Sequence, residues 1–183
     1  MNPVRNRAEL LLPGFVIGLA AGGMAGGLAA LAGLPASYVL ASALGLATPL
    51  ALGGAGYNAL LAAGRVRFGG VAPAALYWVP IFPAARLVHE VTLDAMLGQP
   101  IELPDALIPF LGYQALLSVG FGVGFIWLHE HLAPIWWVYI RHHNPKAEQY
   151  VGGYLKQAAS IERRKAAKRA RTQRPAKRPA RRP

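Results

Sequence analysis

The chain has 183 residues, of which 54% are hydrophobic and only 15% are charged. A soluble domain of this length carries about a quarter charged residues, so the composition indicates a membrane protein. The absence of cysteine excludes disulfides, thiolate metal sites and a cysteine nucleophile. The formal net charge of +11 is concentrated at the C-terminus, because 11 of the 19 Lys and Arg residues follow Glu162.

Four apolar stretches occupy most of the first 140 residues: 10–34, 37–63, 69–88 and 106–128. A helix needs about 20 mostly apolar residues to cross the hydrocarbon core of a bilayer. We therefore predict an all-α protein whose residues 1–143 form a bundle of four transmembrane helices.

Basic residues lie only on alternate sides of these stretches: Arg5 and Arg7, then Arg65 and Arg67, then Arg141 and Lys146. The connection 89–105 carries only acidic charges. Basic residues near helix ends stay in the cytoplasm, so we expect both termini there. A cleaved signal peptide is the alternative for the first stretch, but its apolar run exceeds the usual 7–15 residues. Usage rich in Ala, Gly, Arg and Pro suggests a bacterial plasma membrane.

The first apolar stretch carries glycines at strict four-residue spacing: Gly14, Gly18, Gly22 and Gly26. Residues four apart share one helix face, and a stripe of small residues lets another helix backbone approach closely. We favour packing inside the bundle, and docking on another subunit is the alternative.

The third apolar stretch contains Pro73, Pro80 and Pro83. Interior prolines remove helical hydrogen bonds, so we expect this helix to be kinked or partly unwound.

Arg86, His89, Glu90 and Asp94 fall on one face of the continuation of this helix. Ionisable residues at membrane depth are functional candidates. A solvated interfacial segment is the favoured alternative, with Arg86 reaching outward to water. The spacing of these residues is poor for a metal, so we predict no metal site and no cofactor.

Aromatic and histidine residues gather after the fourth stretch. Pro134 is expected to start a new segment, 134–140, in which Trp136, Trp137 and Tyr139 would anchor the chain at the membrane interface. We expect His129, His131, His142 and His143 to lie at the level of the lipid headgroups.

Asn144 followed by Pro145 is a typical helix start, with a capping residue before a proline at the first helical position. We predict an amphipathic basic helix over 144–171 on the cytoplasmic side and a disordered, proline-rich basic tail over 172–183. Anionic lipid is the first partner expected for the basic residues of the helix: Arg163, Arg164, Lys165, Lys168, Arg169 and Arg171.

No triad or nucleotide-binding loop is visible, so no catalytic residue is predicted. Many packing residues and few convergent polar groups favour an accessory, scaffold or assembly subunit that binds another membrane protein. A membrane enzyme or carrier using the Arg86 face is the first alternative. A membrane tether that binds nucleic acid or an acidic partner through the basic tail is the second.

Overall fold

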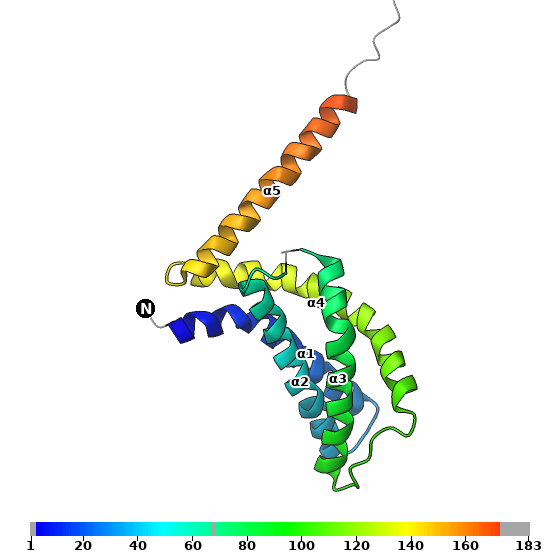
Figure 1. Ribbon diagram of the computed structural model, residues 1–183. Coiled ribbons are helices and arrows are strands. Elements are labelled where there is room, and N and C mark those ends of the chain that lie inside the picture. The colour runs from blue at the N-terminus through cyan, green and yellow to red at the C-terminus, as the bar shows by residue number, and fades with distance from the viewer. Residues whose placement is uncertain (1–2, 67–68, 173–183) are drawn as a thin grey trace, which may run out of the picture.

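The computed structural model describes residues 3–66 and 69–172, which form five helices (Figure 1). They are α1 (Pro3–Leu31), α2 (Ala36–Ala62), α3 (Val71–Leu97), α4 (Leu107–Ile140) and α5 (Pro145–Thr172). The helices α1 to α4 are long and apolar enough to cross a membrane. The prediction of an all-helical, multi-pass membrane protein is therefore confirmed. Arg67 and residues 173–183 of the predicted tail lie outside the described residues.

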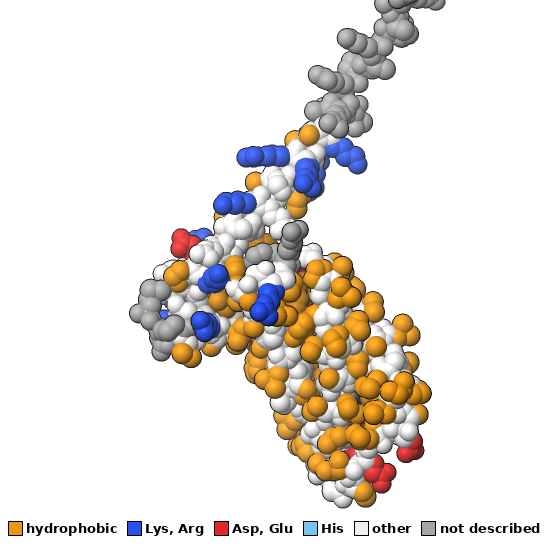
Figure 2. Space-filling model, in the orientation of Figure 1, with side chains coloured by type: hydrophobic (Ala, Val, Ile, Leu, Met, Phe, Trp, Pro, Cys, Tyr) orange, Lys and Arg blue, Asp and Glu red, His pale blue; other side chains and the backbone are white. Residues whose placement is uncertain are grey.

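Charge separates the two ends of the α1–α4 body. Lys and Arg gather at the end that carries the start of α1, the connection 63–70 and α5, which we call the basic end (Figure 2). Acidic side chains lie at the opposite end, which carries the connections 32–35 and 98–106 and which we call the acidic end. The surface between the ends is mostly apolar, as expected where lipid replaces water as the solvent.

The closest helix pair is α1 with α2. Gly14, Gly18, Gly22 and Gly26 all face α2, and a methyl group added at any of them would overlap atoms of α2. At the basic end, Gly14 lies directly against Gly54 of α2, backbone to backbone. Helix α2 of the same chain thus covers the glycine stripe. The alternative prediction, that this stripe binds another subunit, is wrong.

An aromatic core joins α2, α3 and α4. Trp78 of α3 is fully buried and its ring lies 4.6 Å from Phe121 and 4.9 Å from Phe125, both of α4. Tyr57 of α2 meets Phe125 edge to face at 5.3 Å. Such edge contacts between rings add to the stabilisation from burial, and they hold α4 against α3 rather than against α1.

The interior prolines do not interrupt their helices. Helix α3 is continuous through Pro80 and Pro83, so the alternative of partial unwinding is wrong, and a kink there stays a prediction. The prediction that Pro134 starts a new segment is wrong, because α4 continues through it to Ile140. Pro73 lies in the first turn of α3, where the backbone N–H groups have no helical partner in any case. A single interior proline removes only one helical hydrogen bond, and the packed neighbours keep the remainder of each helix intact.

Helices α1 and α4 contact each other much less than either contacts its main partner, α2 or α3 respectively. The gap between them forms an apolar groove of about 370 Å³, with Leu50 of α2 and Phe82 of α3 among its lining residues. From α1 it is lined by residues such as Met24 and Leu28, and from α4 by Gly124 and Leu128. We call this hollow the α1–α4 groove.

Helix α5 projects away from the bundle (Figure 1). Only its first three turns pack on the other helices, through Ala147, Tyr150, Val151 and Tyr154. Burial there raises the pKa of Tyr150 to about 12. From Leu155 to residue 169 every side chain is exposed.

Gly22 and Gly23 offer a matched test of the α1–α2 contact. Gly22→Ala places a methyl group against Ala47 of α2, and overpacking of this kind costs about 1–3 kcal/mol. Gly23→Ala meets no atom within 4 Å, and alanine is favoured over glycine in a helix by about 0.5–1 kcal/mol. We expect Gly22→Ala to lower the midpoint of unfolding in detergent and Gly23→Ala to raise it. Equal shifts would contradict the packing described.

Candidate functional site

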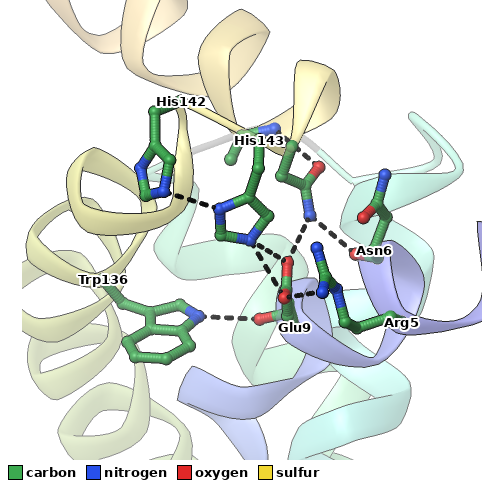
Figure 3. Close-up of polar contacts among 8 residues, drawn as sticks. Arg5, Asn6, Glu9, Trp136, His142 and His143 are labelled. Carbon is green, nitrogen blue, oxygen red and sulfur yellow. Dashed lines mark hydrogen bonds and ion pairs between the residues drawn. The ribbon is translucent and has the colours of Figure 1, made fainter. Parts of the chain in front are cut away.

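At the basic end, a proline in α1 leaves one backbone carbonyl of that helix without its N–H donor, and a side chain of α4 supplies a donor instead. Pro13 has no backbone N–H, so the carbonyl of Glu9 loses its helical partner. The indole Nε1–H of Trp136 in α4 donates to this carbonyl oxygen at 2.8 Å (Figure 3). Inside a membrane every backbone polar group needs such a partner, so this bond fixes α4 to α1 where the proline interrupts the helix.

The carboxylate of Glu9 joins α1 to the turn between α4 and α5. Its two oxygens lie 3.0 and 2.9 Å from Nε2 of His143, and Nδ2 of Asn144 donates to it at 3.2 Å (Figure 3). Arg5, one turn earlier in α1, forms an ion pair with it at 3.4 Å. Three donors of this kind allow a carboxylate to remain charged in a mostly buried position.

Asn144 is buried and has two functions. Its Oδ1 accepts from the backbone N–H of Ala147 at 3.3 Å, which caps the N-terminus of α5, and its Nδ2 donates to the carbonyl of Asn6 at 2.8 Å. The predicted helix start at Asn144 and Pro145 is therefore confirmed. The same amide also attaches the beginning of α5 to the beginning of α1.

A second buried amide links three helices. Nδ2 of Asn58 in α2 donates to the carbonyl of Leu10 in α1 at 2.9 Å, which leaves Oδ1 as an acceptor. Nε2 of His129 in α4 lies 2.7 Å from Oδ1 and must therefore carry the hydrogen. Both side chains are buried. Tyr57, Phe125 and Trp137 surround the ring of His129, so this side chain does not contact lipid headgroups, and its depth in the membrane stays a prediction.

Glu130 connects α4 to two further segments. Its carboxylate accepts from the backbone N–H of Gly69 at 3.1 Å and from the hydroxyl of Tyr154 in α5 at 2.9 Å. Burial and the neighbouring Glu130 carboxylate raise the pKa of Tyr154. The hydroxyl therefore stays protonated and remains a donor.

We call these side chains the basic-end network: Glu9, Asn58, His129, Glu130, Trp136, His143, Asn144 and Tyr154. The sequence analysis missed it as a cluster. The available signal was the presence of Glu9 and Asn58 in or beside apolar stretches, since polar groups there need partners. Their partners lie far along the chain and only the fold identifies them.

The three predicted interfacial aromatics differ in their surroundings. Tyr139 is exposed, and Trp136 is partly buried with its indole nitrogen bound to Glu9. Trp137 has 0% of its surface exposed and packs against Tyr150. A side chain without exposed surface cannot contact lipid headgroups, so the prediction for Trp137 is wrong.

The predicted polar cluster near the acidic end is only partly assembled. Arg86 contacts Nδ1 of His89 at 2.6 Å and pairs with Glu90. Asp94 lies apart from this group and instead accepts from the backbone N–H of Glu102 at 3.4 Å. Because a guanidinium only donates, the neutral His89 ring carries its hydrogen on Nε2, a buried atom without a partner among the described residues.

The basic residues predicted to contact lipid lie along the exposed part of α5. Arg163, Arg164, Lys165 and Arg169 are exposed, as is Lys168, and Lys165 pairs with Glu162 at 3.0 Å. The side chain of Arg171 lies outside the described residues.

The side chains of the basic-end network have a structural role, because their hydrogen bonds mainly join one helix to another. Within the described residues, no group of three His, Asp or Glu side chains is arranged to hold a metal ion.

Comparison with known proteins gave no match. No protein-family model matches the sequence, and neither a curated protein nor a solved structure is significantly similar to it.

The bond between Trp136 and Glu9 predicts a coupled mutational effect. Trp136→Phe removes the donor and should cost about 1–3 kcal/mol, because the Glu9 carbonyl loses its partner. Pro13→Ala restores a backbone N–H to that carbonyl. In the Pro13→Ala background, Trp136→Phe should therefore cost less, and unfolding of all four proteins in detergent measures the difference. Equal costs in the two backgrounds would show that the carbonyl has another partner.

The pair of Asn58 and His129 predicts a second non-additive effect. His129→Phe leaves the buried amide oxygen of Asn58 without a donor, at a cost of about 1–3 kcal/mol. Adding Asn58→Leu removes that acceptor, although the Leu10 carbonyl then loses its donor. We expect the double variant to be more stable than the sum of the single effects predicts, as measured by unfolding midpoints. Strict additivity would contradict the hydrogen bond.

Proposed function

We propose that this protein is an accessory or assembly subunit of a larger membrane complex in a bacterial plasma membrane. The observation that carries the proposal is the α1–α4 groove. A helix of a partner membrane protein would lie in it, between two transmembrane helices that contact each other over only a short stretch.

Exposed glycines lie on both helices that border this groove. An added Cβ would meet no atom of the chain within 4 Å at Gly124, which lines the groove, or at Gly120 of α4 and Gly23 and Gly27 of α1, which lie outside its lining. Both pairs have the spacing that permits close approach of helix backbones in lipid. These glycines are distinct from the stripe that α2 covers, so α1 has a second small-residue face for the partner.

The proposed orientation has both termini in the cytoplasm. The concentration of Lys and Arg at the basic end, with acidic residues at the other, supports it (Figure 2), because basic residues near helix ends stay inside. In this orientation α5 is cytoplasmic, and its basic residues, with the tail beyond, would contact anionic lipid. An acidic protein or nucleic acid is the other class of partner for the tail.

A second candidate function is a membrane enzyme or carrier at Arg86, His89 and Glu90. The unpartnered, buried Nε2 of His89 favours it, because a buried donor without an acceptor is costly unless a ligand supplies one. The accessory role is the stronger proposal, because all the polar partners of these three side chains within the described residues come from α3 itself.

Photocrosslinking in the native membrane tests the accessory role. We would place a photoreactive residue at Met24, which is 68% exposed in the α1–α4 groove, and as a control at Leu76 of α3, which is 73% exposed and does not line this groove. We expect one abundant protein adduct at position 24 and none of that mass at position 76. Lipid adducts alone at both positions, together with a monomeric particle in mild detergent, would contradict the proposal.

A further inference from the structure

We propose that the junction of α1, α2 and α5 at the basic end binds one anionic phospholipid, whose phosphate lies against Arg7 and Lys146. Its acyl chains would lie along an adjoining apolar hollow between α1 and α2. The site goes beyond the proposed function, because it shares no lining residue with the α1–α4 groove.

A polar hollow lies where the start of α1, the end of α2 and the start of α5 meet, and we call it the headgroup pocket. Its volume is about 490 Å³, within the range of ordinary ligand sites. The cations Arg7 and Lys146 line it together with the carboxamides of Asn6, Asn144 and Gln149. Its described lining contains no Asp or Glu. The charge of this pocket therefore favours an anion.

The two cations are available to a ligand. Arg7 and Lys146 are exposed and form no ion pair with any described residue. The neighbouring Arg5 differs, because it is paired with Glu9. A guanidinium presents a planar fork of N–H donors that matches phosphate, and an ammonium binds phosphate as a point charge. Arg7 and Lys146 can therefore hold one phosphate group between α1 and α5.

An apolar hollow of about 340 Å³ adjoins the headgroup pocket, and we call it the acyl hollow. The two hollows share Arg7, Leu10 and Ala62. A cation thus borders an apolar surface, as a ligand with one anionic and one apolar part requires. A soluble phosphate compound would leave this apolar surface uncovered. The other residues that line the acyl hollow are Leu11, Ala59 and Ala63.

The level of the site in the membrane also suits a phospholipid. Helix α1 has 29 residues, and about 20 are enough to cross the hydrocarbon core. The first two turns of α1, which include Arg7, can therefore lie at the level of the lipid phosphates. An acidic protein segment would match the cations as well, but it has no apolar part for the acyl hollow.

Arg141 provides a matched control at the same end of the bundle. It is exposed, forms no ion pair with any described residue, and lines neither the headgroup pocket nor the acyl hollow. Arg7→Gln and Arg141→Gln therefore change the net charge equally, while only the first alters the proposed site.

Native mass spectrometry of the full-length protein, titrated in detergent with phosphatidylglycerol or phosphatidylcholine, tests the site. We expect one phosphatidylglycerol to bind in preference to phosphatidylcholine. Arg7→Gln and Lys146→Gln should each weaken its binding about fivefold, the effect of one basic residue at an anionic surface. Arg141→Gln should leave binding of this first lipid unchanged. Ala59→Trp, which fills the acyl hollow, should weaken binding of both lipids.

A competition experiment distinguishes the lipid from other anions. An excess of glycerol 3-phosphate, or of a glutamate-rich peptide, should not displace the bound phosphatidylglycerol, because neither compound covers the acyl hollow. Displacement by either one would overturn the assignment to a lipid.

Three further results would overturn the proposal: equal effects of Arg7→Gln and Arg141→Gln, no preference for the anionic lipid, or unchanged binding in Ala59→Trp. If Ala59→Trp does not fold, Ala63→Phe fills the same hollow from the end of α2. Failure of the lipid site leaves crosslinking at Met24 unaffected, so the two proposals are tested separately.

Discussion

The backbone contact between α1 and α2 is the constraint on which the arrangement of the bundle depends. Because Gly14, Gly18, Gly22 and Gly26 have no side chains, α1 can lie directly on α2 along most of its length. Helix α4 is held on α3 by large side chains instead, through the ring contacts of Trp78 with Phe121 and Phe125. Helix α1 is thus bound mainly to α2 and helix α4 mainly to α3, whereas α1 and α4 contact each other much less. The α1–α4 groove is a consequence of where the small and the large residues lie.

The basic end closes by a different kind of interaction. Water cannot satisfy backbone groups within a bilayer, so the carbonyl that Pro13 releases requires a donor from another helix. Trp136 supplies it, and Asn58 makes a similar bond to the next carbonyl, that of Leu10. These bonds are directional, whereas apolar packing is not. They fix the relative positions of α1, α2 and α4 at the end where α5 and the basic residues emerge.

Much of this fold can be predicted from the sequence, because length and hydropathy alone specify four apolar helices. The glycine stripe also predicts a close helix contact, but spacing cannot identify the partner, since one face suits α2 as well as another protein. Trp137 shows the main limit. An aromatic residue near a helix end is expected at the interface, yet the first turns of α5 cover it. The polar network could not be predicted, because members that bind each other, such as Glu9 and Asn144, are 135 residues apart in the chain.

The two ends of the space between α1 and α4 therefore differ in how the helices are held. At the basic end the hydrogen bond from the Trp136 indole to the Glu9 carbonyl joins them directly. Farther along, no described hydrogen bond joins the two helices, and exposed glycines offer backbone to a neighbour. A partner helix there would replace lipid, whose chains cannot pack against glycine as closely as another helix can.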